Sequence, residues 1–394
     1  MDNTSPVRNL RFFRAYYFFF IGAGGFLSPF VTLFYKSRGL NGAEIGLLGA
    51  LAAFSAMLTA PIWGRLGDTS SRPRRLIKAA LLASACFALL RGIQSFFWSI
   101  CLFIILDALF GSGTTSLSSL QALAAVNGEK SGFGSVRLWG SLGWAVVTPL
   151  AGFLIERLGL YIPFAGYAAM LVLAACALAF VRGNPTSGRS GARPGHVPVR
   201  RVLRSLAGNR AMVGMALAFV TIWISTAGRV QFETLYMSQL GAKTGLIGIA
   251  GTVSALFEVP FMLLADRLIH RYGTGRILRI SIIVQAVSFL PVVLFHSIPG
   301  IFLTRILASI ALSLNAPSYY NYLVECAPPG QGTTVVSFFD VTLRNGVGLV
   351  AAPLAGLLFD LLGPYWLYAI GMGGCLLAWS FLQILAHPQQ AETV

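Results

Sequence analysis

The sequence predicts an all-α membrane protein whose twelve transmembrane helices form two pseudo-symmetric six-helix bundles. Of the 394 residues, 56% are hydrophobic and 11% are charged, whereas soluble domains carry roughly 25% charged residues. Most apolar runs are about 20–28 residues long, enough for a helix to cross a hydrocarbon core of ~30 Å. Sequence matches between the two halves of the chain supply the third observation.

The apolar runs define the expected helices, and the alternating pattern of membrane barrel strands is absent. In chain order the helices cover residues 11–35, 44–66, 76–94, 97–124, 134–156, 161–182, 209–238, 243–266, 276–296, 299–325, 333–358 and 364–386. The first run follows Arg11 and Arg14 but lacks a small-residue cleavage site. We therefore expect a first membrane helix there, not a signal peptide.

The distribution of basic residues predicts the orientation in the membrane. Most of the 29 Lys and Arg residues fall in the loops and helix ends of one side. Five are assigned to the other side: Lys36, Arg38, Arg91, Arg157 and Lys243. The positive-inside rule then places both termini in the cytoplasm, and we expect a bacterial inner-membrane protein. The net charge of +16 is thereby explained without nucleic acid as a partner.

Metal, disulfide and nucleotide chemistry find no support in the sequence. The five cysteines occur singly with no CxxC spacing, and the four histidines are scattered, so we expect neither a metal site nor a disulfide framework. No Walker motif is present, which disfavours an ATP-driven pump. We expect no cofactor and no enzymatic activity.

The two halves of the chain resemble each other. Three pairs recur in the same order at offsets near 200: SAMLTAP (55–61) with SALFEVP (254–260), PLAGFLIERLGLY (149–161) with PLAGLLFDLLGPY (353–365), and FVTLFY (30–35) with FETLYM (232–237). Three matches in register indicate a duplication. We expect a first bundle over 1–182, a polar central loop over 183–208 and a second bundle over 209–394.

The same loop of each half carries an acidic residue followed by a basic cluster. The segments GRLGDTSSRPRR (64–75) and LADRLIHRYGTGR (264–276) resemble motif A of the major facilitator superfamily. This resemblance implies a charge network that holds the inward-closed state. Its residues would be Asp68, Arg72, Arg74 and Arg75, with Asp266 and Arg267 as a weaker copy that lacks the leading glycine. The alternative is a set of positive-inside residues beside a helix-end acid.

A second motif, SVRLWGSLGW (135–144), is similar to the branch that contains phenylpropionate permeases, akin to nucleoside and lactose proton symporters. The resemblance implies a monomeric secondary transporter that imports a small organic solute (an aromatic acid, a nucleoside or a sugar) with protons by alternating access. A proton-coupled exporter is the alternative, although VVTPLAG (146–152) separates the proline and glycine expected of drug exporters. A non-transporting receptor or scaffold on the same fold is a further alternative.

Charged residues inside membrane helices are costly and usually face a cavity or one another. Eight are assigned to the interior of the expected helices, away from the basic helix ends: Asp107, Arg137, Arg229, Glu233, Glu258, Arg305, Asp340 and Arg344. The i,i+4 spacing places Arg229 and Glu233 on one helix face, and likewise Asp340 and Arg344. The acids and the arginines are equal in number, so every arginine could be paired and the charge of the solute stays open.

Comparison of the two halves of the sequence indicates a candidate for the proton-carrying residue. Glu258 aligns with Thr59 and Arg229 aligns with Leu27, so the charges occur in the second half alone. We expect Glu258 to carry the proton, the alternative being a permanent Glu258–Arg229 ion pair. Asp107 is the second candidate; otherwise it partners an arginine.

Polar and aromatic residues on the expected cavity helices are candidates for solute contact, because hydroxyl and amide groups hydrogen-bond a ligand while rings stack on it. For each of them, helix packing is the alternative. They are Tyr16, Tyr17, Phe20, Asn315, Tyr319, Tyr320, Asn321 and Asn345.

Overall fold

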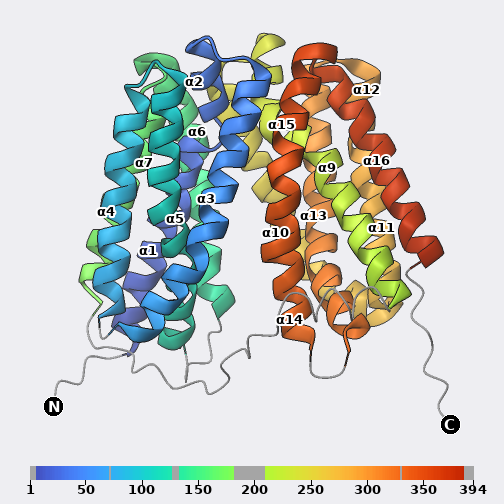
Figure 1. The fold of residues 1–394 in the computed structure, drawn as a ribbon, viewed down its shortest axis with the longest axis horizontal. Helices are drawn as coiled ribbons and strands as arrows, with labels where there is room; N and C mark the ends of the chain where they lie inside the picture. The colour runs from blue at the N-terminus through green and yellow to red at the C-terminus, as the bar shows by residue number, and fades with distance from the viewer. Residues whose placement is uncertain (1–5, 71, 127–132, 182–208, 329–330, 386–394) are drawn as a thin grey trace. The chain divides into compact units, whose positions relative to one another are not determined.

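The structure is a computed structural model that describes residues 6–70, 72–126, 133–181, 209–328 and 331–385. Every regular element in these ranges is a helix, as Figure 1 shows. The first half contains α1 (Pro6–Leu27), α2 (Val31–Ser37), α3 (Gly42–Thr69), α4 (Pro73–Gly92), α5 (Phe97–Val126), α6 (Phe133–Leu158) and α7 (Ile162–Ala179). The second half contains α9 (Arg210–Gln239), α10 (Thr244–Tyr272), α11 (Thr274–Ser288), α12 (Leu290–Phe295), α13 (Ile298–Cys326), α14 (Gly332–Ser337), a π-helix η1 (Phe338–Leu343), α15 (Arg344–Leu362) and α16 (Pro364–Leu385).

These elements confirm the all-α class and account for all twelve predicted membrane segments. Within the described residues, eleven spans are long and apolar enough to cross a membrane. The remaining predicted segment corresponds to α4, which carries Arg74, Arg75, Lys78 and Arg91 and is therefore less apolar.

Three predicted helices are interrupted. The segment predicted over 11–35 divides into α1 and α2, with a turn at residues 28–30 between them. The segment predicted over 276–296 divides at Phe289 into α11 and α12, and Pro291 lies in the first turn of α12, where a missing N–H is tolerated. The segment predicted over 333–358 contains the π-helix η1 between α14 and α15. None of the three interruptions was predicted from the apolar pattern.

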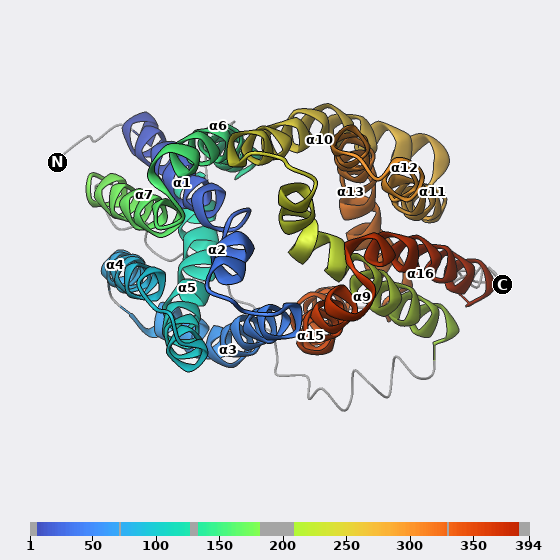
Figure 2. The ribbon, with the colours of Figure 1, turned by 90° about the horizontal axis from the view of Figure 1, so that it is seen from above.

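The chain divides into two compact units. The first comprises Met1–Gly191 with Gly241–Ala255, and the second comprises Ala192–Leu240 with Leu256–Val394. Within the first unit α1 packs against α6 and α7, and α5 packs against α3 and α4. Within the second unit α9 packs against α15 and α16, and α11 packs against α13 and α16. Figure 2 shows the α1 neighbours and the pair α9–α16 from above.

Matching turns in the two halves carry glycines with left-handed backbone. Gly39 and Gly241 have φ angles of 84° and 86°, and Gly159 and Gly363 have φ angles of 94° and 82°. A side chain at such an angle is strained, which explains why glycine occupies both members of each pair. The repeated sequence segments thus fold into repeated turn geometry.

Helices α1 and α6 approach closely through small residues, as the glycines of SVRLWGSLGW allow. A Cβ atom on Gly143 would lie 2.2 Å from the Phe18 carbonyl oxygen, and one on Gly140 would lie 2.4 Å from the Ile21 side chain. On the other side, a Cβ on Gly24 would meet the Trp144 ring at 3.0 Å. This contact places the Trp144 indole beside the α1 residues that line the cavity described next.

Candidate functional site

A cavity of about 630 Å³ lies within the first unit. The residues that line it are Tyr17, Phe20, Ile21, Gly24, Leu27, Ser28, Ala52, Ala56, Arg91, Ile104, Asp107, Ala108, Gly111, Ser112, Thr114, Trp144, Tyr167 and Leu171. They come from helices α1 and α3–α7, and Ser28 follows the end of α1. Three predicted site residues, Tyr17, Phe20 and Asp107, are therefore brought together at one cavity wall.

Asp107 on α5 forms an ion pair with Arg91 near the end of α4. The distance from Arg91 Nη1 to Asp107 Oδ2 is 3.3 Å, and the two side chains are 7% and 12% exposed. Ser84 on α4 donates a hydrogen bond to the other carboxylate oxygen, Oδ1. The Ser84 hydroxyl also lies 3.2 Å from the Tyr167 hydroxyl on α7. Three helices thus hold one carboxylate in a fixed orientation.

Arg91 is a candidate site residue that the sequence analysis missed, because it was assigned to the outer side. Its guanidinium lies 5.3 Å from the Phe164 ring, and its Nε and Nη2 atoms are buried without a hydrogen-bond partner among the described residues. Counting residues from a helix end gives the level of the Cα atom, whereas a long arginine side chain carries its charge well away from that level. The presence of Arg91 in α4 could therefore be read from the sequence, but the position of its guanidinium at the cavity could not.

Hydroxyl groups continue the polar wall of the cavity. The Thr59 hydroxyl lies 2.7 Å from that of Ser112, which lines the cavity with Ser28 and Thr114. Tyr16, in contrast, is fully buried, bonds through its hydroxyl to Ser118 and is not part of the cavity wall. Its ring stacks on Phe20 at a centroid distance of 5.6 Å.

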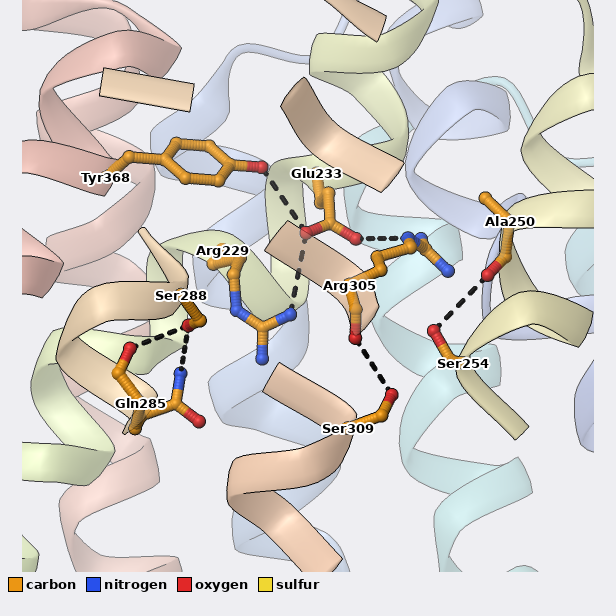
Figure 3. A network of polar contacts seen from close by, with 9 residues as sticks. All are labelled: Arg229, Glu233, Ala250, Ser254, Gln285, Ser288, Arg305, Ser309 and Tyr368. Carbon is orange, nitrogen blue, oxygen red and sulfur yellow. Dashed lines mark hydrogen bonds and ion pairs between the residues drawn. The ribbon is translucent and has the colours of Figure 1, made fainter. Parts of the chain in front are cut away.

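The second unit contains a different charge cluster, centred on Glu233 of α9 (Figure 3). Arg305 Nε of α13 lies 2.6 Å from Glu233 Oε1, and Arg229 Nη1 lies 3.5 Å from Oε2. The Tyr368 hydroxyl of α16 donates to Oε2 at 3.4 Å. Glu233 is 5% exposed. One buried acid therefore carries two arginines and a tyrosine.

The Glu233 cluster bears on three of the sequence predictions. Arg229 and Glu233 share a helix face, as their spacing predicted. The ion pair of Arg229 is made with Glu233, whereas Glu258 on α10 is half-buried and its carbonyl oxygen accepts a hydrogen bond from Ser313 at 2.9 Å. In this cluster two arginines share one acid.

The predicted pair of Asp340 and Arg344 straddles the end of η1, where the wider π turn changes the α-helical register. Asp340 Oδ2 accepts a hydrogen bond of 2.6 Å from the Tyr320 hydroxyl. The guanidinium of Arg344 lies 6.0 Å from the Trp223 ring.

The remaining solute-contact candidates of the second unit lie in several settings. Asn315 donates to the Ser281 hydroxyl at 3.0 Å, and Tyr319 packs on Phe219 with ring centroids 4.3 Å apart. Asn321 is exposed and Asn345 is half-buried. Their roles in solute contact stay predictions.

The predicted gate is described only in part. Arg74 donates to the Val181 carbonyl oxygen at 2.9 Å, and Arg72 and Arg75 are exposed. Asp266 and Arg267 are exposed on α10, and neither belongs to an ion pair found among the described residues. The side chains of Asp68 and Arg137 lie outside the described part, as does the predicted central loop 183–208.

Comparisons with known proteins identify relatives along most of the chain. The model of the family described as MFS_1 like family matches residues 10–370. The maltose permease of Geobacillus stearothermophilus is 28% identical over 348 residues, which is 87% of this chain and 86% of the permease. A multidrug resistance efflux pump PmrA homolog of Lactococcus lactis is 25% identical over 86% of this chain and 85% of the pump.

Among solved structures, the fold is similar to that of the nucleoside transporter NupG. The TM-score is 0.80, the sequence identity is 14%, and the match covers 96% of this chain and 100% of that protein. At this identity the similarity concerns the fold alone.

Proposed function

Because the chain belongs to the MFS_1 like family and is an integral membrane protein that works as a secondary transporter, we propose that it imports a small organic solute together with protons. Alternating access between the two sides of the membrane would carry both. We further propose that it acts as a monomer in a bacterial inner membrane, with both termini in the cytoplasm, as the positive-inside distribution of Lys and Arg favours.

The observation that carries the proton-coupling proposal is the position of Asp107. This carboxylate is buried, lines the cavity and has a single arginine as its counter-ion. A buried carboxylate remains ionised only where a positive charge or hydrogen bonds compensate its lost hydration. When the change between access states moves Arg91 away from Asp107, Asp107 must gain a proton, and when the pair reforms, the proton must leave. Proton transfer is thereby tied to a rearrangement at the solute cavity.

Glu258 is the second proposed proton site. It lies on α10 and is half-buried, with its counterpart Thr59 uncharged in the other half. The proposal assigns the proton to Asp107 first because Asp107 is buried and lines a defined cavity.

Transport in proteoliposomes with an imposed pH gradient tests this function, with a panel of sugars, nucleosides and aromatic acids as solutes. We expect Asp107→Asn to abolish accumulation driven by the gradient while solute exchange at equal pH continues. Glu258→Gln is assayed in parallel. The matched control is Glu156→Gln, since Glu156 lies outside the cavity lining and pairs with the exposed Lys243 at 3.5 Å. Normal accumulation in both the Asp107 and the Glu258 variants would refute proton coupling through these acids.

Export is the second candidate function, favoured by the similarity to the efflux pump over most of the chain. The direction is decided with vesicles of known orientation. An exporter would extrude solute from the cytoplasmic side in exchange for protons, whereas an importer accumulates solute on the side that protons enter. If the vesicles extrude the solute that is transported fastest, with the pH gradient in its physiological direction, the protein is an exporter and the import proposal is wrong.

A further inference from the structure

The chemistry of the first-unit cavity narrows the class of solute. Its lining contains two charged residues, Arg91 and Asp107, which are paired with each other and so contribute no net charge. The rest of the wall consists of hydroxyl groups, four aromatic rings and small or aliphatic side chains. Its volume of about 630 Å³ is within the range of sites that enclose a small organic molecule.

Charge argues against an ionic solute in this cavity. Since Arg91 and Asp107 lie 3.3 Å apart, a carboxylate that approaches the arginine also meets the aspartate, and an ammonium group that approaches the aspartate also meets the arginine. Juxtaposed like charges are strongly disfavoured where water is excluded. An uncharged solute meets no such penalty and leaves the ion pair intact.

The hydrogen-bonding capacity of the pair fits a solute with several hydroxyl groups. Asp107 Oδ1 accepts a hydrogen bond from Ser84, and Oδ2 lies 3.3 Å from Arg91 Nη1. An ionised carboxylate oxygen has room for a further donor. Arg91 has two donor nitrogens, Nε and Nη2, without an acceptor among the described residues. A buried unsatisfied donor is costly, so an oxygen atom from a solute would complete the bonding of Arg91 without displacing Asp107.

The aromatic rings of the cavity wall would contact the apolar part of the solute, in addition to the hydrogen bonds from Arg91 and Asp107. Phe20 is held by stacking on Tyr16 with an interplanar angle of 5°, and Trp144 is held against Gly24. With Tyr17 and Tyr167 they offer apolar faces next to polar hydroxyls. A solute ring with an apolar face and hydroxyl groups at its edge fits this combination. The aromatic side chains would stack on the apolar face, and the hydroxyl and charged side chains would hydrogen-bond the edge hydroxyls.

We infer that this cavity binds an uncharged, polyhydroxylated ring compound, a saccharide or a nucleoside, and that Arg91 is a specificity residue for it. The inference rests on the proposed function and selects among its solutes, since it excludes the aromatic acids. Arg91 contributes directed donors to the oxygen atoms of the solute, whereas Asp107 accepts from its hydroxyls.

Direct binding to the purified full-length protein, measured by calorimetry without a pH gradient, tests the inference. The panel pairs compounds of similar size: phenyl β-glucoside and uridine as uncharged polyols, phenylpropionate as a carboxylate and phenylethylamine as a cation. We expect one of the uncharged classes to bind, and both charged compounds to bind at least about tenfold more weakly because of like-charge repulsion. Which polyol binds distinguishes a saccharide from a nucleoside site. Preferential binding of either charged compound would overturn the inference.

Two variants test the location of the site. Arg91→Lys keeps the charge but loses the fork of donors, so the affinity for the uncharged compound should fall about tenfold, the loss of one hydrogen bond to a charged group. Gly111→Val adds bulk to the cavity wall, where a Cβ meets only the Ser84 hydroxyl, at 3.9 Å, and should abolish binding in a folded protein. The control is Gly373→Val on α16, where a Cβ meets nothing within 4 Å. Unchanged binding in Gly111→Val would overturn the location.

The two proposals fail in distinguishable ways. Binding of an uncharged polyol with no proton-driven accumulation would refute the proposed coupling and leave the solute class standing. Proton-driven uptake of an aromatic acid, with no binding of polyols, would refute the solute class and leave the coupling standing.

Discussion

The charge pair of the first unit and the charge cluster of the second unit use the same residue types in different proportions. Asp107 has one arginine, one serine donor and a cavity at its side. Glu233 has two arginines and a tyrosine donor and is not part of that cavity wall. Protonating Asp107 would leave one arginine to be solvated, whereas protonating Glu233 would leave two neighbouring buried cations. The number of counter-ions and the presence of a cavity therefore separate a group suited to switching from a group suited to holding helices together.

The largest expected effect follows from removing the acid with two partners. Glu233→Gln leaves Arg229 and Arg305, whose side chains are 17% and 13% exposed, without the Glu233 carboxylate. Breaking a buried ion pair by removing one partner costs about 3–5 kcal/mol. We expect a large fall in the thermal unfolding midpoint of the detergent-solubilised protein. Asp107→Asn should cost less stability, since its arginine borders a cavity. An equal loss of stability in the two variants would contradict the contrast between the clusters.

An intermediate effect distinguishes the two arginines of the cluster. Arg305 lies 2.6 Å from Glu233 and Arg229 lies 3.5 Å from it. Arg305→Gln should cost about 1.5–3 kcal/mol, the value of a hydrogen bond to a charged group. Arg229→Gln should cost less than about 1 kcal/mol, because it leaves Glu233 with one arginine, as in the first unit. Denaturation of the two variants side by side measures the difference, and the reverse order would show that distance does not rank them.

The smallest expected effect concerns the hydroxyl donors. Tyr368→Phe removes one hydrogen bond of 3.4 Å to Glu233 and should lower the free energy of unfolding by about 0.5–1.5 kcal/mol, with no change in solute uptake. Ser84→Ala removes the corresponding donor to Asp107 and should alter the pH profile of uptake more than stability. Both readouts are taken on both variants, and an altered uptake profile in Tyr368→Phe would remove the functional distinction between the units.

Much of the fold could be predicted because the length of an apolar run decides whether a helix crosses the membrane. The break at Phe289 and the π turn at Phe338–Leu343 could not be predicted in this way, because both leave the apolar run uninterrupted. Pro291 is a sequence signal for the start of α12, but the length of an apolar run takes no account of it.

A polar residue could be predicted as a site residue where it is charged and stands alone in an apolar run. Asp107 and Glu233 are isolated acids in apolar runs and were singled out, and the spacing of Arg229 and Glu233 placed them on one helix face, although the ion pair considered for Arg229 was with Glu258. Arg91 was missed because it lies one residue before the end of α4. Tyr368 was missed because a tyrosine in an apolar helix is common and carries no signal until its hydroxyl is seen beside a charge.

The π turn at Phe338–Leu343 affects whether this membrane segment can lose a single residue and still fold. A π turn closes its hydrogen bonds five residues apart and so accommodates one residue more than an α turn. Deleting one residue there lets α-helical bonding close the gap, and α15 keeps its faces towards the same neighbours. The same deletion in the middle of α15 would rotate every later side chain by about 100°. The segment therefore has one place where a single-residue deletion is tolerated.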